Sequence, residues 1–305
     1  MIDANFLVSV VAAATPLLLA ATGELVAERS GVLNLGIEGM MLVGAVLAFI
    51  TAHLTGSATL GFFAGAAAGL AMSFGFAVLT LTLLANQVAS GLALTIFGTG
   101  LSALIGTKFV GIAIAGIPKL HVPLLSSIPL AGPLLFGEDA LVYLSFAILA
   151  GVSWFLFRTH WGLVLRAVGD NQDAAHAIGY PVIKLRYCAT MFGGAMAGLA
   201  GAYMSLAYSP LWAENMTGGR GWIALALVVF ATWRPLWLLA GSYLFGLILY
   251  SSLYVQGLGV AVPSQLISAL PYLGTVVVLV LISRDRARTR RNAPACLGQP
   301  FHAAS

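Results

Sequence analysis

Long apolar runs with almost no charge constrain this chain more than any other feature. Several of the runs reach about 18 residues or more, enough to cross a hydrocarbon core about 30 Å thick. Only 8% of the residues are charged, against about 25% in a typical soluble domain, so a soluble fold could not cover its surface. Inside a bilayer all backbone polar groups must be bonded internally, which leaves helices or closed barrels. Because the runs do not alternate apolar and polar residues, we predict an all-α, polytopic transmembrane helical bundle.

About eight to ten spans are expected, some of them broken or re-entrant. No basic residue precedes Arg29, so the first run reads as a retained span and not as a signal peptide. We assign residues 1–283 to one transmembrane domain and residues 284–305 to a basic cytoplasmic tail, expected to be disordered. The nine expected spans are 6–21, 32–54, 60–84, 88–105, 141–157, 187–207, 222–233, 236–254 and 266–282, the seventh being short for a full crossing.

The distribution of lysine and arginine predicts how the chain lies in the membrane, because cytoplasmic loops accumulate these residues. With the arginine-rich C-terminus inside, eleven of the 14 basic residues fall inside and three outside. An odd number of spans would then place the N-terminus outside. The outer loops, 107–139 and 209–221, are either ordinary interfacial loops or a docking surface for an external partner.

Glycines recur at a spacing of four residues on two of the expected helices. Gly61, Gly65 and Gly69 share one helical face, and Gly194 and Gly198 share another. Small residues at this spacing let helix backbones approach closely within a membrane. The pattern indicates tight packing in a bundle and does not identify what the bundle carries.

The segment 23–39 contains a carboxylate inside an apolar run. An ionised Glu38 there is costly unless it is paired, so Glu38 and its neighbour Asn34 are candidate pathway residues. The glycines around them suggest a broken helix, which is tolerated at membrane depth only against protein or water. Two structural alternatives remain open, since Glu38 could cap a half-helix or pair with Arg29.

A second polar group opens the fourth expected span. Asn86, Gln87 and Ser90 lie at its start, and Thr95 follows about one and a half turns after Ser90. These side chains could line a polar pathway or cap a helix at the inner surface, and the cap is slightly favoured.

The loop between the fifth and sixth expected spans contains a short helix with clear end signals. Asp170 or Asn171 is a suitable N-cap, Gly179 is a natural residue to end the helix, and Pro181 follows. About two turns of helix are not stable alone in water, so this one lies on the membrane surface or packs into a partner. The expected coupling residues are Asp170, Asn171, Asp173, Ala174, Ala175, His176 and Gly179.

Several motifs are missing from the sequence, and their absence narrows the classes of function. It has no G-x-x-x-x-G-K-[ST] phosphate loop, no H-E-x-x-H and no G-x-S-x-G, so we expect no catalytic residues, no metal and no cofactor. Few intramembrane charges are available to couple ions. A transporter powered by a separate subunit explains these absences most simply. The alternatives are a stand-alone secondary transporter or channel, and an intramembrane enzyme.

Four stretches carry a resemblance to a known family. They are ERSGVLNLGIEGMM at 28–41, NQVASGLAL at 86–94, RAVGDN at 166–171 followed by two alanines at 174–175, and PLWAENMT with GRGWIAL at 210–225. They resemble permeases of bacterial ATP-binding-cassette (ABC) importers of the branched-chain amino acid/ribose type, nearest to the nucleoside and simple-sugar branch. The resemblance covers about residues 24–246.

The resemblance implies a working assembly in the bacterial cytoplasmic membrane. Two permease subunits, identical or paired with a similar one, would form the pathway within the membrane lipid. Two cytosolic ABC ATPases would bind the coupling helix, matched here by residues 170–179, and an extracytoplasmic binding protein would deliver a nucleoside, purine or simple sugar. No nucleic acid polymer is expected as a partner. ATP hydrolysis would take place in the separate subunits, so this chain would not itself be an enzyme.

Overall fold

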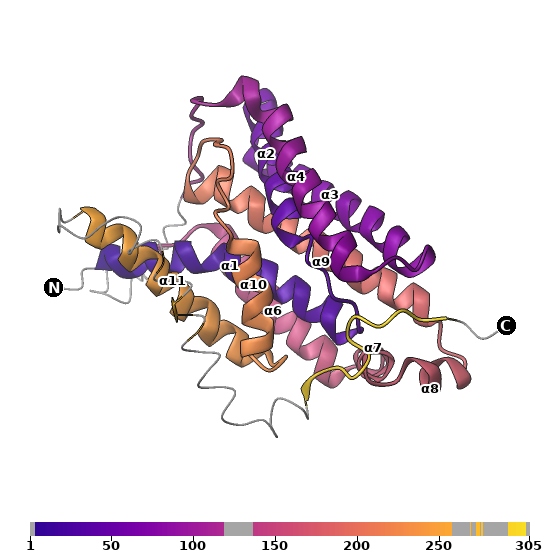
Figure 1. The fold of residues 1–305 in the computed structure, drawn as a ribbon. Helices are drawn as coiled ribbons and strands as arrows, with labels where there is room; N and C mark the ends of the chain where they lie inside the picture. The colour runs from indigo at the N-terminus through magenta and orange to yellow at the C-terminus, as the bar shows by residue number, and fades with distance from the viewer. Residues whose placement is uncertain are drawn as a thin grey trace.

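The computed structural model describes residues 4–118, 137–257 and 292–302, and the single residues 269, 273, 274 and 276. Across these residues the chain is helical, and its only β-type pairings are two isolated bridges between the segments 110–113 and 211–212. Figure 1 shows the arrangement. The helices are α1 Ala4–Arg29, α2 Ile37–Thr55, α3 Ala58–Ala77, α4 Gln87–Gly106, α6 Ala140–Arg158, α7 His160–Asp170, α8 Gln172–Ala177, α9 Val182–Tyr203, α10 Arg220–Phe230 and α11 Pro235–Gly257, with short π or 3-10 turns at Val78–Thr82, Thr107–Phe109 and Met204–Tyr208.

The polytopic all-helical prediction is confirmed. Within the part of the chain that the structure describes, six helices, α1, α2, α3, α4, α6 and α11, are long and apolar enough to cross a membrane. Helix α9 is also long, but it is rich in glycine and alanine and less apolar. Helix α10 has 11 residues, in agreement with the short seventh span. The expected span 266–282 lies largely outside the described residues.

Three expected span ends differ from the helix ends by five residues or more, when each π turn is counted with the helix that it extends. The sixth expected span began at residue 187, whereas α9 begins at Val182, and the other two differences lie in one region. The first helix continues past residue 21 to Arg29, and the second begins at Ile37 and not at residue 32. Polar residues in the last turns of α1, Glu24 and Glu28, are buried and bonded within the protein, so their polarity does not end the helix. The break therefore falls at residues 30–36, between two buried helices.

Helix α9 is the centre of the packing and contacts α1, α2 and α3. The expected glycine faces meet one another here. A β-carbon at Gly69 would overlap the carbonyl oxygen of Gly194, and one at Gly198 would overlap the carbonyl oxygen of Gly65. Backbone therefore packs directly on backbone, as small residues at four-residue spacing allow.

The helices fall into two groups around α9 (Figure 1). Helices α2 and α3 pack on α9 and α4 packs on α2, whereas α6, α10 and α11 gather around α1. Helices α7 and α8 lie together at one end, beside the last described segment of the chain. At this end also lie the C-termini of α1 and α6 and the start of α9.

Candidate functional site

The connection between α1 and α2 is a buried loop whose backbone groups are satisfied by side chains. The amide of Leu33 donates to Oε1 of Gln87 at 2.8 Å, and the amide of Asn34 donates to Oε1 of Glu24 at 3.2 Å. The Asn34 side chain in turn accepts from the amide of Gly36 at 2.9 Å. Non-helical backbone is tolerated at membrane depth only when other protein groups bond it, and these contacts meet that requirement.

Glu38 lies in the first turn of α2, and its carboxylate reaches the N-terminus of another helix. It is 7% exposed and accepts from the Thr217 hydroxyl at 2.5 Å, the Gly219 amide at 2.8 Å and the Gly221 amide at 2.6 Å. These groups begin α10, whose unpaired amides and dipole favour a negative charge. Of the two structural alternatives, the half-helix cap is the one observed.

Arg29 is not the partner of the Glu38 carboxylate. Its guanidinium donates to the backbone oxygen of Trp233 at 2.8 Å and to that of Asn292 at 3.0 Å. The buried ends of α1 and α10 are instead joined through Glu28, whose carboxylate accepts from the indole nitrogen of Trp233.

The second polar group forms hydrogen bonds both to the α1–α2 loop and at the N-terminus of α4. Asn86 is the N-cap of α4 and accepts from the Ala89 amide at 3.0 Å, which fits the favoured capping role. Gln87 bonds the α1–α2 loop through Leu33, and the Thr95 hydroxyl donates to the backbone oxygen of Leu35 at 2.9 Å. Ser90, one turn after Asn86, is partly exposed. The structure thus brings Asn34, Gln87 and Thr95 together around one loop, with Glu38 just beyond it.

The short helix predicted at 170–179 is present as α8. Its N-cap is Asn171, whose side chain accepts from the Ala174 amide at 2.9 Å. Gly179 follows with a left-handed φ of +93°, and the Tyr180 amide donates to the carbonyl of Ala175 at 3.1 Å. Ala175 is buried, whereas Asp170, Asp173, Ala174, His176 and Gly179 are exposed. One face of α8 is therefore packed and the other is free.

Residues 292–302, part of the segment expected to be disordered, are packed beneath α7 and α8. Gly298 donates to the carbonyl of Gly31 at 3.0 Å, and the Gln172 side chain donates to the carbonyl of Pro300 at 3.1 Å. The buried Arg186 of α9 bonds both Ser30 and Gln299 through their carbonyl oxygens. The segment joins the α1–α2 loop to α8.

Sequence reasoning missed two parts of this arrangement. From the sequence, Arg186 served only as a positive charge for predicting the orientation of the chain in the membrane. In the structure it is fully buried and joins the α1–α2 loop to residues 292–302. The ordering of that segment depends on contacts more than a hundred residues apart, which no local pattern reveals. Its turn residues, Pro294 and Gly298, were the only local signal.

The loop 209–221 is anchored to the helices beside it. Trp212 is fully buried against α2 and α4, and a β-carbon at Gly106 would overlap its ring. The bridges with residues 110 and 113 tie this loop to the segment after α4. Glu214 and Asn215 remain exposed at its tip.

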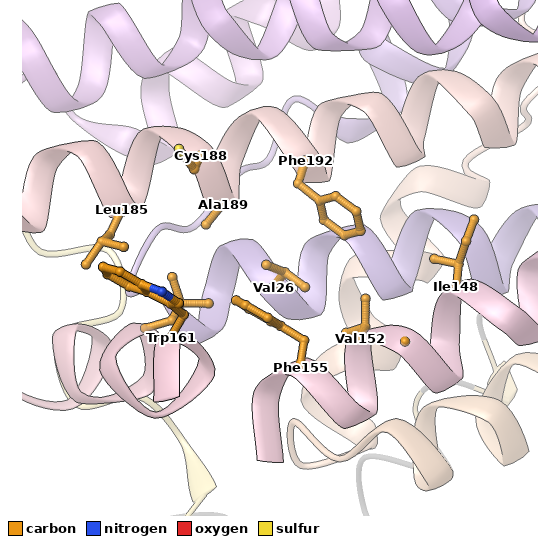
Figure 2. A pocket seen from close by; sticks show the side chains of 11 residues that line it. Val26, Ile148, Val152, Phe155, Trp161, Leu185, Cys188, Ala189 and Phe192 are labelled. Atoms are coloured by element: carbon orange, nitrogen blue, oxygen red, sulfur yellow. The ribbon is translucent and has the colours of Figure 1, made fainter. Parts of the chain in front are cut away.

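A cavity of about 580 Å³ lies between α6 and α9 (Figure 2). The close view shows side chains of both helices converging on it, with Val26 of α1 between them and Trp161 of α7 at one end. Apart from the thiol of Cys188 and the indole N–H of Trp161, its lining is apolar. Such a cavity offers hardly any polar partner to a hydroxylated solute and is a poor site for one.

The fold defines a multi-pass helical membrane protein. The chain belongs to the family described as branched-chain amino acid transport system/permease component, whose model matches residues 6–282.

Three relatives cover nearly the whole chain. The permease protein TsgC13 of Haloferax volcanii, named for a proposed glucose ABC transporter, is 43% identical over 98% of each chain. The nucleoside ABC transporter permease NupC of Lactococcus lactis is 33% identical over 88% of each chain. The guanosine ABC transporter permease NupQ of Bacillus subtilis is 32% identical over 94% of this chain and 93% of its own.

Proposed function

We propose that this chain is the permease subunit of an ATP-driven ABC importer that carries a small neutral polar solute, a simple sugar or a nucleoside. The observation that carries the proposal is the likeness, over nearly the full length, to permeases named for glucose and nucleoside transport. Near the helix break, Ser90 is partly exposed and the Nε2 atom of Gln87 has no hydrogen-bond partner among the described residues, and such neutral polar groups suit a hydroxylated solute better than a charged one.

The coupling role falls to α8 in this proposal. The helix has six residues, too few to be stable alone, yet α7 on one side and residues 292–302 on the other hold it in place. Its free face exposes Asp173, Ala174 and Gly179, and the neighbouring Ile178 is 73% exposed. A rigidly held helix with a free face can transmit movement from a bound ATPase to the membrane domain.

The proposed orientation places α7, α8 and residues 292–302 in the cytoplasm, in the cytoplasmic membrane of a prokaryotic cell. Six basic residues support it, because they gather at this end of the helices. Arg29, Arg166 and Arg234 line one cavity there, Arg186 bonds Ser30, and Arg158 and Lys184 lie at the adjoining ends of α6 and α9. A second permease subunit and an external binding protein complete the proposed assembly.

The solute class can be tested with labelled compounds. Proteoliposomes holding this chain, its ATPase and its binding protein would be offered glucose, guanosine and leucine in competition. We expect accumulation of the sugar or the nucleoside and no competition from leucine. Accumulation of leucine alone would contradict the proposed solute class.

The alternative, a stand-alone secondary transporter or channel, predicts a different result in the same vesicles. It requires transport by this chain alone, driven by an ion gradient or by the solute gradient. Uptake that continues when the ATPase is omitted would favour it over the ABC importer.

A further inference from the structure

A cavity distinct from the helix break lies where three candidate spans end. Its volume is about 490 Å³, and it lies between the C-termini of α1 and α6, helix α7 and the start of α11. Three guanidinium groups line it, those of Arg29, Arg166 and Arg234. Among the described residues Asp170 is the one carboxylate in the lining, so three positive charges less one negative leave a net charge of +2.

Among the residues that the structure describes, no carboxylate in the lining other than Asp170 offsets this charge. Within the same residues, the guanidinium of Arg29, 7% exposed, donates only to neutral carbonyl oxygens, and its Nε atom has no hydrogen-bond partner. The Nε atom of Arg166 is likewise buried without a partner, and its guanidinium lies 5.0 Å from the centre of the Phe157 ring. Buried guanidinium groups with unused donors favour an anionic ligand, and phosphate oxygens match their geometry best.

The position of the cavity indicates which anion would fill it. Helix α6 ends at Arg158 and α11 begins at Pro235, so the cavity lies at the level where two membrane spans meet the headgroups. Two apolar residues of its lining face outward beside Arg234, with Leu236 78% exposed and Trp237 53% exposed. Tryptophan is typical of this interface, and exposed apolar side chains serve an acyl chain but not a free inorganic ion.

We infer that this cavity binds the phosphate of an anionic phospholipid. The three arginines hold the headgroup, and the acyl chains run along α6 and α11 past Leu236 and Trp237. Basic pockets between transmembrane helices on the cytoplasmic side bind such headgroups by the same chemistry. The bound lipid would contact both the end of α1 and α7. Because α8 directly follows α7, the lipid would also link α1 to α8.

Lipid binding to the purified full-length chain tests this inference without any transport assay. Delipidated protein in neutral detergent would be titrated with phosphatidylglycerol, phosphatidylcholine or inorganic phosphate, and bound ligand counted by native mass spectrometry. We expect phosphatidylglycerol to bind at least tenfold more tightly than phosphatidylcholine. The double variant Arg166→Gln/Arg234→Gln should lose at least tenfold in affinity for phosphatidylglycerol, about 1.4 kcal/mol, because it removes two of the three charges that hold the headgroup.

Two further variants keep the test decisive. Arg158→Gln removes an exposed charge at the end of α6 that does not line the cavity, and it should bind phosphatidylglycerol as the unchanged protein does. Arg234→Gln alone alters an exposed side chain, so it should fold even if the double variant does not, and it should still weaken binding. Equal affinity for both lipids, an equal loss in Arg158→Gln, or displacement of the lipid by millimolar phosphate would overturn the inference.

Discussion

Replacing Glu38 with glutamine tests whether its carboxylate holds α10 in place. The carboxylate accepts three hydrogen bonds, from Thr217, Gly219 and Gly221. A glutamine keeps one oxygen and turns the other acceptor into a donor, which faces a buried amide that then has no partner. One charge-assisted bond contributes about 1.5–3 kcal/mol, and the charge at a helix N-terminus adds about 0.3–2 kcal/mol. The expected loss in free energy of unfolding is therefore about 2–5 kcal/mol.

Reversible unfolding in mixed detergent micelles would measure this loss. The matched control is Glu214→Gln, because Glu214 is exposed at the tip of the same loop, and it should change stability by no more than about 0.5 kcal/mol. If Glu38→Gln were as stable as this control but changed only the apparent affinity for solute, Glu38 would be a solute-binding group. The capping account would then be wrong.

Three further variants probe other contacts. Ala174→Trp on the free face of α8 should leave the basal ATPase activity of the assembly intact and reduce solute uptake at least tenfold. The control Ala147→Trp, at an exposed position of α6, should leave uptake unchanged. Gly198→Leu should prevent correct folding, seen as aggregation in size-exclusion chromatography, because its side chain would overlap the carbonyl of Gly65. Removing residues 292–305 breaks the bonds to the α1–α2 loop and to Gln172 and should destabilise the protein by about 2–4 kcal/mol in the same unfolding assay, whereas unchanged stability would show that this packing contributes nothing.

The parts of the fold that depend on residues close together in the sequence could be predicted from the sequence. The N-cap Asn171 and the terminating Gly179 lie within eight residues of each other, so α8 could be predicted nearly to its ends. The glycine faces of α3 and α9 were recognisable because four-residue spacing is a property of one helix. Which helix each face would meet was not predictable.

The parts that escaped prediction depend on distant contacts. Glu38 caps residues about 180 positions later in the chain, so the sequence could only offer a cap or a pairing with Arg29. The end of α1 was placed too early because Glu24 and Glu28 look like surface residues until their buried partners are known. Residues 292–302 are held by backbone bonds to Gly31 and Gly169, by the Arg186 side chain of α9 and by the buried ring of Phe301, and composition does not reveal these distant partners.

The central claim is that this chain moves its solute with energy supplied by a separate ATPase. The most direct measurement is the initial rate of solute uptake into proteoliposomes that contain the chain and its ATPase. The binding protein is added on the outside, and ATP or ADP is trapped on the side of the membrane that the ATPase faces. We predict accumulation against a solute gradient with ATP, and none with ADP or with this chain alone. Equal uptake with ADP, or by the chain alone, would contradict the account.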